Sequence, residues 1–368
     1  MPSGKSFTCF QGKVVLVTGH TGFKGSWLSL WLIELGANVV GFSRDIPTNP
    51  SLFVDINLQD KLYADIRGDV SNFVSLSDVI NQYKPSFVFH LAAQALVPHS
   101  FVDPLLTFQS NTLGTITILE VLRNITHNCV SILITSDKVY ENNEWCWGYR
   151  ESDSLGGKDP YSASKACAEL AFSSYFQSFF RHRSTNLIAT VRAGNVIGGG
   201  DWSERRIVPD IVRSYDSSIQ LKLRAPLATR PWQHVLEPLS GYLLLASQLF
   251  SGNIASGQSF NFGPSSESVH TVQDLVNEFN THFSVPPTVF SHDQSVVDAS
   301  LLKLCCDKAL SVLGWSSTLD FPLTVQYTAE WYLRRSTLIR HAGFTSELSA
   351  FTVGQIGDFC SRAPHFQE

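Results

Sequence analysis

Short apolar runs alternate with helical stretches through the first half of this chain. Residues 13–19, 38–44, 63–70, 87–92, 130–135 and 187–192 form predicted strands, and residues 26–35 form a predicted helix that ends at Gly36. Strands that are apolar along their whole length are typical of a parallel sheet covered by helices on both faces. Because the connections between such strands are right-handed, the sequence predicts an α/β fold with a doubly wound, Rossmann-like parallel sheet.

The second half of the chain has a different pattern. A glycine-rich stretch at 194–201 precedes a predicted helix at 207–215, and residues 259–263 form one more predicted strand. Open α/β sheets bind their ligands beyond the carboxyl ends of the strands. We therefore expect residues 12–193, with returning segments near 230–263, to form a dinucleotide-binding domain. Residues 194–368 are expected to form mostly a smaller C-terminal α/β substrate-binding lobe.

The composition excludes several classes of protein. Of the 368 residues, 43% are hydrophobic and only 16% are charged, which rules out a mostly disordered chain. A formal net charge of -5 gives no electrostatic reason to expect a nucleic-acid partner. The seven cysteines contain no CxxC pair, so we predict no metal site and a reduced, cytoplasmic protein. No apolar run is long enough for a signal peptide or a membrane span, so no membrane partner is expected.

A glycine-rich turn, TGHTGFKG at 18–25, joins the first predicted strand to the first helix. Glycines let a backbone turn tightly and approach a pyrophosphate, whose charge meets free N–H groups at the helix start. We therefore predict a dinucleotide site here, and the alternative is a βα turn with only a structural role. The predicted cofactor contacts are Gly19, Thr21, Gly22, Phe23, Lys24 and Gly25.

The end of the second predicted strand bears on which dinucleotide binds. An acidic residue normally holds the adenosine ribose there, but this chain has Ser43 and Arg44. Arg44 can contact a 2′-phosphate, which would favour NADP, or stack on the adenine as a solvated side chain. We expect NAD, with NADP as the less favoured alternative and weak discrimination between them. Asp69 and Val70 follow the third strand, where an adenine contact is expected, although Asp69 can also cap a helix.

A tyrosine and a lysine lie one helical turn apart, at Tyr161 and Lys165. Tyrosine is a poor base at neutral pH, but a neighbouring ammonium group favours its phenolate. Upstream, Ser136, Asp137 and Lys138 follow a predicted strand, where side chains reach the cofactor crevice. These five residues are the predicted catalytic group. Taken alone, Asp137 and Lys138 are better explained by a turn with a surface ion pair.

In this order the motifs resemble one known family, the extended short-chain dehydrogenases/reductases that act on nucleotide sugars. Longer segments are similar to its CDP-glucose 4,6-dehydratase branch, and the resemblance covers roughly residues 12–265. It implies an NAD-dependent hydro-lyase without net redox that turns CDP-D-glucose into CDP-4-dehydro-6-deoxy-D-glucose and water. That product feeds the 3,6-dideoxyhexoses of the lipopolysaccharide O-antigen. The shared segments are TGHTGFKG, HLAAQ at 90–94, SDKVY at 136–140 and YSASK at 161–165, with 144–151, 192–202 and 230–241 for the branch.

The resemblance also implies a role for each catalytic residue. The Tyr161 phenolate removes the proton of the sugar C4 hydroxyl, while Ser136 and Lys165 hold the geometry. Asp137 protonates the C6 hydroxyl that leaves as water. The position of Lys138 holds a glutamate in dTDP-glucose 4,6-dehydratases, so this lysine is the informative departure. A lysine acts as a base only when neutral, and we hypothesise that burial and the Lys165 cation make Lys138 the base that removes the C5 proton.

Further binding residues are carried over from the same resemblance. Arginine suits a diphosphate because its guanidinium donates two parallel hydrogen bonds, and residues 204–230 hold a local excess of positive charge. Trp145, Trp147 and Tyr149 are expected either to form a loop over the active site or to pack that loop. The residues expected beside the cofactor are Leu91, Ala92, Ala93 and Asn111, and those expected beside the nucleotide sugar are Gln94, Asn195, Arg206 and Arg230.

An assembly is implied as well. Extended family members usually pair two helices, predicted here at 104–123 and 161–180, with their copies. A homodimer with a four-helix interface is therefore expected, and a tetramer is the alternative. Three other functions stay open: a 4,6-dehydratase of another nucleotide sugar, a nucleotide-sugar 4-epimerase, and a non-catalytic dinucleotide-sensing protein. The Asp137 and Lys138 pair argues against the epimerase, and the Tyr161 and Lys165 pair argues against the sensor.

Overall fold

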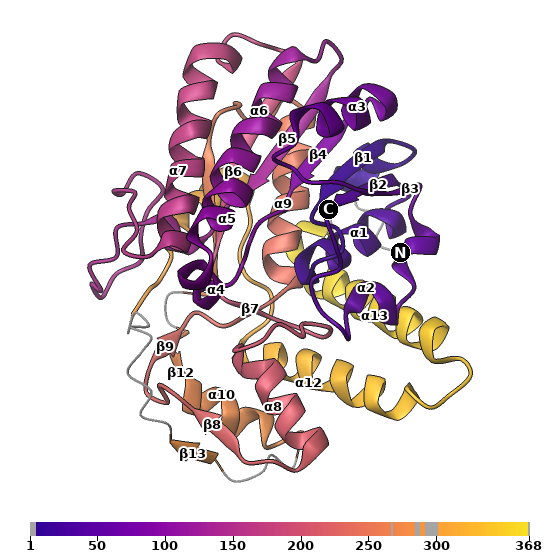
Figure 1. Cartoon of the computed structure of the whole chain (residues 1–368), viewed down its shortest axis with the longest axis vertical. Coiled ribbons are helices and arrows are strands. Elements are labelled where there is room, and N and C mark those ends of the chain that lie inside the picture. Colours follow the sequence, from indigo (N-terminus) through magenta and orange to yellow (C-terminus); the bar gives the residue numbers. More distant parts are fainter. Residues whose placement is uncertain (1–4, 266–267, 284–287, 291–300, 367–368) are drawn as a thin grey trace.

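A seven-stranded sheet forms the centre of the computed structural model, which describes residues 5–265, 268–283, 288–290 and 301–366 (Figure 1). The strand order is β11-β6-β5-β4-β1-β2-β3, and each neighbouring pair is parallel. The order reverses between β1 and β4, which confirms the predicted doubly wound, Rossmann-like sheet. The strands are β1 (Val14–Thr18), β2 (Asn38–Ser43), β3 (Ala64–Arg67), β4 (Phe87–His90), β5 (Cys129–Ile134), β6 (Asn186–Ala193) and β11 (Ser259–Phe262).

Helices cover both faces of this sheet. On one face α3 (Phe73–Tyr83), α6 (Gly114–Asn124) and α7 (Pro160–Tyr175) pack against one another, and on the other lie α1 (Phe23–Glu34) and α9 (Leu236–Phe250) (Figure 1). Every residue of β4 and β5 is buried as a result. This burial on both sides explains why the predicted strands are apolar along their whole length.

Two long predicted helices each contain a wider π-helical turn. The helix predicted at 104–123 consists of α5 (Pro104–Phe108), a π-turn (Gln109–Leu113) and α6. The helix predicted at 161–180 consists of α7 followed by a π-turn (Phe176–Phe180). Such turns are frequent at functional sites, and the first of them contains Asn111.

A smaller lobe lies beyond the carboxyl ends of the strands (Figure 1). Its helices and short strand pairs include the helix predicted at 207–215, and the strand predicted at 259–263 joins the main sheet as β11. The lobe contains α8 (Ile207–Ser217), α10 (Val272–Phe279), β8 (Leu221–Leu223) paired with β13 (Thr288–Phe290), and β9 (Thr229–Arg230) paired with β12 (His270–Thr271). Another pair, β7 (Val196–Ile197) and β10 (Gln233–His234), leads into it.

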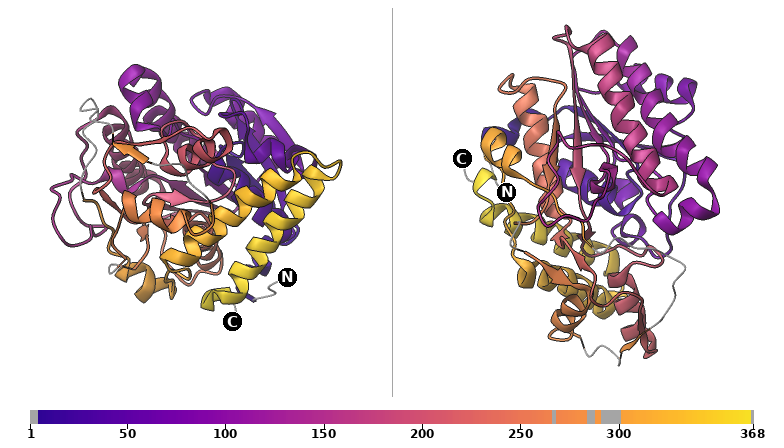
Figure 2. Two further views of the ribbon diagram at one scale, coloured as in Figure 1. Left: turned by 90° about the horizontal axis from the view of Figure 1, so that it is seen from below. Right: turned by 90° about the vertical axis from the view of Figure 1, so that its left-hand side faces the viewer.

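The C-terminal helices connect the lobe to the sheet. α12 (Phe321–Leu338) packs on α10, whereas α13 (Phe344–Arg362) packs on α1 and on α2 (Leu52–Asp55) of the dinucleotide-binding half. Phe366 stacks on Phe7 with 4.2 Å between ring centroids, so both ends of the described chain lie side by side (Figure 2). The sequence did not indicate this return of α13, and the exact domain boundary stays a prediction. The other short helices are α4 (Val97–Val102) and α11 (Asp307–Leu313).

The ranges that the structure describes contain neither a helix long and apolar enough to cross a membrane nor a cluster of three metal-ligating side chains. The seven cysteines are all unpaired. Apolar packing therefore holds this fold together. That packing buries polar groups too, and His234 is the clearest example.

His234 is fully buried where the lobe meets the sheet. Its ring packs edge-on against Trp27 and Tyr327, with centroid distances of 5.9 and 5.5 Å. Burial lowers the pKa of His234 to about 3, so the folded protein keeps this ring neutral through mildly acidic conditions.

We expect the free energy of unfolding to fall as the pH decreases from about 6.5 toward 3. The unfolded chain takes up a proton on His234 below its ordinary pKa of 6.5, whereas the folded chain does so only near 3. One such group removes about 1.4 kcal/mol of stability per pH unit within that window. Urea unfolding at several pH values should show a shallower acid loss for His234→Asn. Parallel curves for the two proteins would contradict this assignment.

Candidate active site

The glycine-rich turn between β1 and α1 is closely packed. Gly19 has a φ of 78°, and a Cβ atom there would lie 2.7 Å from the backbone nitrogen of Ala92. A Cβ atom on Gly25 would lie 2.0 Å from the carbonyl oxygen of Gly19. Gly22 precedes the helix without a side-chain cap, so the first turn presents its backbone N–H groups to an anion. Thr21 and Phe23 flank Gly22 in the same turn.

The end of β2 places Ser43 and Arg44 in different surroundings. The buried Ser43 Oγ lies 2.9 Å from His20 Nδ1, and burial lowers the pKa of that histidine. Arg44 is exposed, and its Nε donates to Asp45 Oδ2 at 3.1 Å. A carboxylate therefore lies beside Arg44 and partly offsets the positive charge that would attract a 2′-phosphate.

Asp69 forms a turn after β3. Its Oδ1 accepts hydrogen bonds from the backbone N–H and the hydroxyl of Ser71, at 2.8 and 2.7 Å. Asn72 is the residue that caps α3, so the alternative role of Asp69 as a helix cap is wrong. Val70 is buried next to it. The adenine contact of Asp69 and Val70 stays a prediction.

Asn111 fixes the segment after β4 against the helix that carries Tyr161. Its Oδ1 accepts from the Gln94 N–H at 2.8 Å, and its Nδ2 donates to Ser164 Oγ at 2.9 Å. The predicted cofactor residues Leu91, Ala92 and Ala93 lie just before this anchor, and the Ala92 N–H donates to Thr18 Oγ1 at 3.2 Å. Asn111 thereby holds one wall of the crevice at the point where the strand order reverses.

A short 3-10 turn (Asp137–Val139) follows β5 after two residues, Thr135 and Ser136. The Ser136 hydroxyl precedes it, donating to Asp137 Oδ1 at 2.9 Å and accepting from the Lys138 N–H at 3.2 Å. Asp137 is buried, and among the described residues its Oδ2 has no hydrogen-bond partner. Lys138 is half-buried. An exposed ion pair, the simpler explanation of these two residues, is therefore wrong.

Tyr161 is buried on α7, which begins at Pro160 as predicted. Burial raises the pKa of Tyr161 above its ordinary value, while the Ser136 hydroxyl lowers it. Among charged side chains, Asp137 raises this pKa further and Arg206 lowers it. The phenol, the carboxyl group and the guanidinium of these residues therefore lie together at the carboxyl end of β5.

Lysine and arginine side chains from three elements lie near the carboxyl end of β5. Burial lowers the pKa of Lys24 to about 8, and Arg206 and Lys165 lower it while Asp137 opposes them. Burial also lowers the pKa of Lys165 to about 8, and its Nζ donates to the carbonyl at the end of β5 at 3.3 Å. Arg206 precedes α8 and pairs with Asp201 at 2.9 Å. This local positive charge suits a ligand that carries phosphates.

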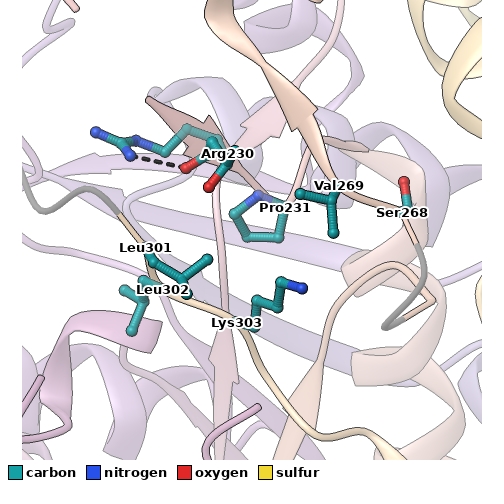
Figure 3. A pocket seen from close by; sticks show the side chains of 8 residues that line it. Arg230, Pro231, Ser268, Val269, Leu301, Leu302 and Lys303 are labelled. Carbon is teal, nitrogen blue, oxygen red and sulfur yellow. Dashed lines mark hydrogen bonds between the residues drawn. The ribbon is translucent and has the colours of Figure 1, made fainter. Parts of the chain in front are cut away.

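Arg230 lines a pocket together with residues 301–303 (Figure 3). Its Nη1 donates to the Thr229 carbonyl at 2.8 Å. Lys303 is a second cation in the same lining, which holds no acidic residue. Sequence reasoning missed Lys303, because it lies far along the chain in an otherwise apolar run. The pocket is lined by Thr229, Arg230, Pro231, Ser268, Val269, Leu301, Leu302 and Lys303.

The remaining predicted substrate residues lie elsewhere. Asn195 is half-buried between β6 and β7, directly after Gly194, where a Cβ atom would lie 3.4 Å from Asp137 Oδ2. The Gln94 side chain already holds its own loop, since its Nε2 donates to Thr107 Oγ1 at 2.9 Å. Asn195 and Arg206 thus lie toward the catalytic group, whereas Arg230 lines the pocket of Figure 3. Their contacts with a sugar nucleotide stay predictions.

The loop after the catalytic turn carries three aromatic side chains. Trp145 packs between Trp147 and Tyr149, with centroid distances of 5.5 and 5.3 Å. Trp147 is 61% exposed and, with Trp145, lines a second pocket that also includes Arg150 and Asp153. Tyr149 therefore packs the loop, whereas Trp147 is exposed on its surface.

The model of the GDP-mannose 4,6-dehydratase family matches residues 16–328 of this chain. The chain belongs to this family of nucleotide-sugar 4,6-dehydratases. It is 44% identical over 328 residues to a CDP-glucose 4,6-dehydratase of Salmonella typhimurium, covering 88% of this chain and 91% of that protein. It is 26% identical over 322 residues to a UDP-glucose 4-epimerase of Lacticaseibacillus casei, covering 83% and 92%.

Solved structures share the fold of this 4,6-dehydratase family member. The epimerase Mth375 of Methanothermobacter thermautotrophicus superposes with a TM-score of 0.78 at 23% identity, over 92% of this chain and 97% of that one. A dTDP-glucose 4,6-dehydratase of Bacillus anthracis in complex with NAD gives a TM-score of 0.73 at 21% identity, over 89% and 98%. These likenesses confirm the predicted fold class.

A nicotinamide dinucleotide fits the crevice of this 4,6-dehydratase. The turn at Gly19 and Gly25 leaves no room for side chains, and the start of α1 offers N–H groups to a pyrophosphate. Tyr161 and Lys165 lie buried at the carboxyl ends of the neighbouring strands, where such a cofactor reaches its substrate. These features support a nicotinamide dinucleotide without distinguishing NAD from NADP.

Proposed function

We propose that this chain converts CDP-D-glucose into CDP-4-dehydro-6-deoxy-D-glucose and water. One observation carries the proposal: the buried Asp137 lies beside Ser136, Lys138 and Tyr161 in a chain 44% identical to a CDP-glucose 4,6-dehydratase. Within the described part of the chain, the Asp137 Oδ2 has no hydrogen-bond partner. An elimination needs an acid and a base in addition to the group that deprotonates the C4 hydroxyl. A 4-epimerase has no use for this second pair.

The reaction follows from the proton-transfer groups of the site. Tyr161, as its phenolate, takes the proton of the C4 hydroxyl, and Ser136 donates to the sugar. A nicotinamide dinucleotide held by the Gly19–Gly25 turn would supply the hydride acceptor for C4 and the hydride donor for C6. Lys138, in its neutral form, removes the C5 proton made acidic by the new ketone. Asp137, in its protonated form, gives its proton to the C6 hydroxyl, which leaves as water. Lys138 then returns a proton to C5 as hydride is added at C6. The oxidation at C4 is thereby matched by the reduction at C6, so no net redox occurs.

Binding of the diphosphate is assigned to the positive side chains around the site. Arg230 and Lys303 line one pocket, and Lys24 and Arg206 lie beside the catalytic group. A guanidinium donates two hydrogen bonds to a phosphate, and an ammonium adds a point charge. The nucleotide-sugar lobe of residues 194–368 supplies all of these except Lys24. We assign the base preference to this lobe as well.

A panel of nucleotide sugars tests the proposed activity. The purified chain is incubated with NAD and separately with the CDP, dTDP, GDP and UDP glucose conjugates, and each product is identified by NMR. The expected result is a 4-keto-6-deoxy sugar from CDP-glucose and little from the others. A C4-inverted sugar would instead establish an epimerase. Cofactor binding without turnover of any sugar would point to the sensing role.

NAD is the proposed cofactor, and we infer only weak discrimination against NADP. No acidic side chain ends β2, and Arg44 is already paired with Asp45. Without an acidic side chain, the site lacks the group that usually favours NAD by binding the ribose hydroxyls. Because Arg44 is paired, its attraction for the 2′-phosphate of NADP is weaker as well. Calorimetric titration with both cofactors tests the inference, and a far tighter affinity for NAD would refute it.

The protein is further proposed to form a homodimer through α5, α6 and α7. Large apolar side chains on these helices are exposed in the single chain, including Leu105 at 77% and Leu170 at 58%. An apolar surface of this kind marks an interface with a partner. A second copy of the same helices would complete a four-helix contact, and a tetramer would need a further surface.

The double variant Leu105→Lys, Leu170→Lys is expected to run as a monomer in size-exclusion chromatography with light scattering. Each lysine would place a charge in the apolar contact, where its desolvation opposes association. Leu227→Lys is the matched control, because Leu227 is 81% exposed but lies in the lobe. If the double variant had the same molar mass in solution as the wild type, these helices would not form the interface.

The cytoplasm is the proposed location, since the seven unpaired cysteines suit a reducing compartment. The product is a 4-ketone that lacks a C6 hydroxyl, which enzymes of 3,6-dideoxyhexose synthesis for an O-antigen would consume. Detection of such a dideoxysugar in cells that carry the chain, and its loss on deletion, tests this role.

A further inference from the structure

A buried pair of charges lies directly behind the catalytic group. Arg192 on β6 donates from Nε and Nη2 to the two carboxylate oxygens of Glu169, at 3.0 and 2.9 Å. Glu169 follows Lys165 by one turn of α7, and it also accepts from Thr135 Oγ1 at 2.6 Å. Thr135 is the residue before Ser136. Both charges are nearly inaccessible, with side-chain exposures of 4% and 2%, and each is paired, as burial requires.

Arg192 also binds both ends of the loop of residues 141–151, which follows the catalytic turn. Its Nη1 donates to the Tyr140 hydroxyl at 2.8 Å and to the Glu151 carbonyl at 3.1 Å. The Tyr140 hydroxyl in turn donates to Asn261 Oδ1 at 2.7 Å. Tyr140 and Glu151 are the two ends of the loop that carries Trp145 and Trp147. One guanidinium therefore holds both ends of that loop.

Asn261 on β11 completes the connection to the pocket of Figure 3. Its Nδ2 donates to the carbonyls of Tyr149 and Cys305, at 2.8 and 3.1 Å. Tyr149 and the 303–305 segment are joined by their backbones as well, from the Tyr149 N–H to the Lys303 carbonyl at 2.9 Å. Lys303 lines the pocket of Figure 3 with Arg230.

We propose that Glu169, Arg192, Tyr140 and Asn261 form a positioning relay that holds the 141–151 loop and Lys303 in the geometry that binds the nucleotide sugar. The inference rests on the proposed function, because it assigns the loop and the pocket to that substrate. These four residues are positioning residues, since they act on the site through the loop and through Lys303. The hydroxyl of Tyr140 is the link whose removal disturbs least, because its ring stays stacked on Tyr149 with centroids 5.1 Å apart.

Tyr140→Phe tests the relay in the full chain, and Tyr242→Phe is its matched control. Tyr242 is also fully buried and its ring packs on Phe262, the neighbour of Asn261, but its hydroxyl has no hydrogen-bond partner among the described residues. Hydrogen exchange and steady-state kinetics are measured for both variants. In Tyr140→Phe, peptides of the 141–151 loop should exchange faster while those of α7 do not change. The KM for CDP-glucose should rise about 10-fold with kcat nearly unchanged, because the loss affects binding in the ground and transition states alike.

The possible failures are distinguishable. A wild-type chain inactive on CDP-glucose would remove the proposed function on which the relay rests. An active wild type together with a Tyr140→Phe variant whose KM stays within about 2-fold of it would overturn the relay alone. A fall in kcat at unchanged KM would also overturn it, because the link would then serve the catalytic group and not the binding wall. Equal changes in KM and hydrogen exchange for Tyr140→Phe and Tyr242→Phe would also overturn the relay, because loss of any buried hydroxyl would then have the same effect.

Discussion

Replacing Tyr161 with phenylalanine is expected to lower kcat on CDP-glucose by about 10³-fold, the scale of a lost general base. The substitution removes only the hydroxyl, and the ring stays in its buried place on α7. Because burial raises the pKa of Tyr161, the phenolate depends on the groups around it, and the Ser136 hydroxyl and Arg206 lower that pKa. NAD affinity and the KM for the sugar nucleotide should change little.

A matched control for this variant is Tyr175→Phe on the same helix. Tyr175 is half-buried, and its hydroxyl donates to Glu120 at 3.2 Å, away from the catalytic group. Its activity should stay close to that of the wild type. If Tyr161→Phe kept more than about a tenth of the wild-type kcat, another group would be deprotonating the C4 hydroxyl. Isotope-labelled substrate would then locate the step that still proceeds.

The sheet could be predicted because strands buried on both faces need apolar residues at every position. Strands such as β5, buried at every residue, have to be apolar throughout. The glycine turn was equally predictable, since a Cβ atom on Gly25 would collide with the Gly19 carbonyl. Features of this kind depend on residues that are neighbours in the sequence. The same local patterns placed Ser136 and Asp137 just after β5, and Tyr161 and Lys165 on one helix, as the structure has them.

Contacts between distant segments could not be read from the sequence. Lys303 reaches the Arg230 pocket from a run whose pattern predicts only packing. Helix α13 returns to pack on α1, although nothing in its composition distinguishes that surface from the lobe. Arg192 ends a predicted strand, but nothing in the sequence pattern indicated Glu169, the partner that makes its burial possible. In each case the tertiary partner, not the local pattern, decides the role of the residue.

The second large effect is expected at Lys138. Lys138→Ala should lower kcat by about 10²- to 10⁴-fold if this amine removes the C5 proton. In D2O the wild-type enzyme should place deuterium at C5 of the product, and the variant should not. Oxidation at C4 precedes the C5 step, so the near-ultraviolet absorbance of the reduced nicotinamide should still appear in a single turnover. Normal oxidation at C4 together with lost exchange at C5 would show that the variant fails only in removing the C5 proton.

Two further variants make the test of Lys138 specific. Lys158→Ala removes an exposed amine from the segment between the Asp137–Val139 turn and α7, and should leave exchange intact. The Lys158 Nζ donates to the Asn142 carbonyl at 3.4 Å. Lys138→Glu replaces one base by another and should recover part of the C5 exchange that the alanine variant loses.

Normal exchange in Lys138→Ala would instead move the role to another amine. Lys24 and Lys165 would be the candidates, because burial lowers the pKa of each to about 8 and so raises the neutral fraction that a base requires. Of these two, Lys24 has Asp137 as an electrostatic neighbour. Lys138 is only half-buried, so solvent deuterium can reach its amine in the wild-type enzyme. A loss of exchange in the variant therefore indicates that the base is missing, and not that solvent is excluded from the site.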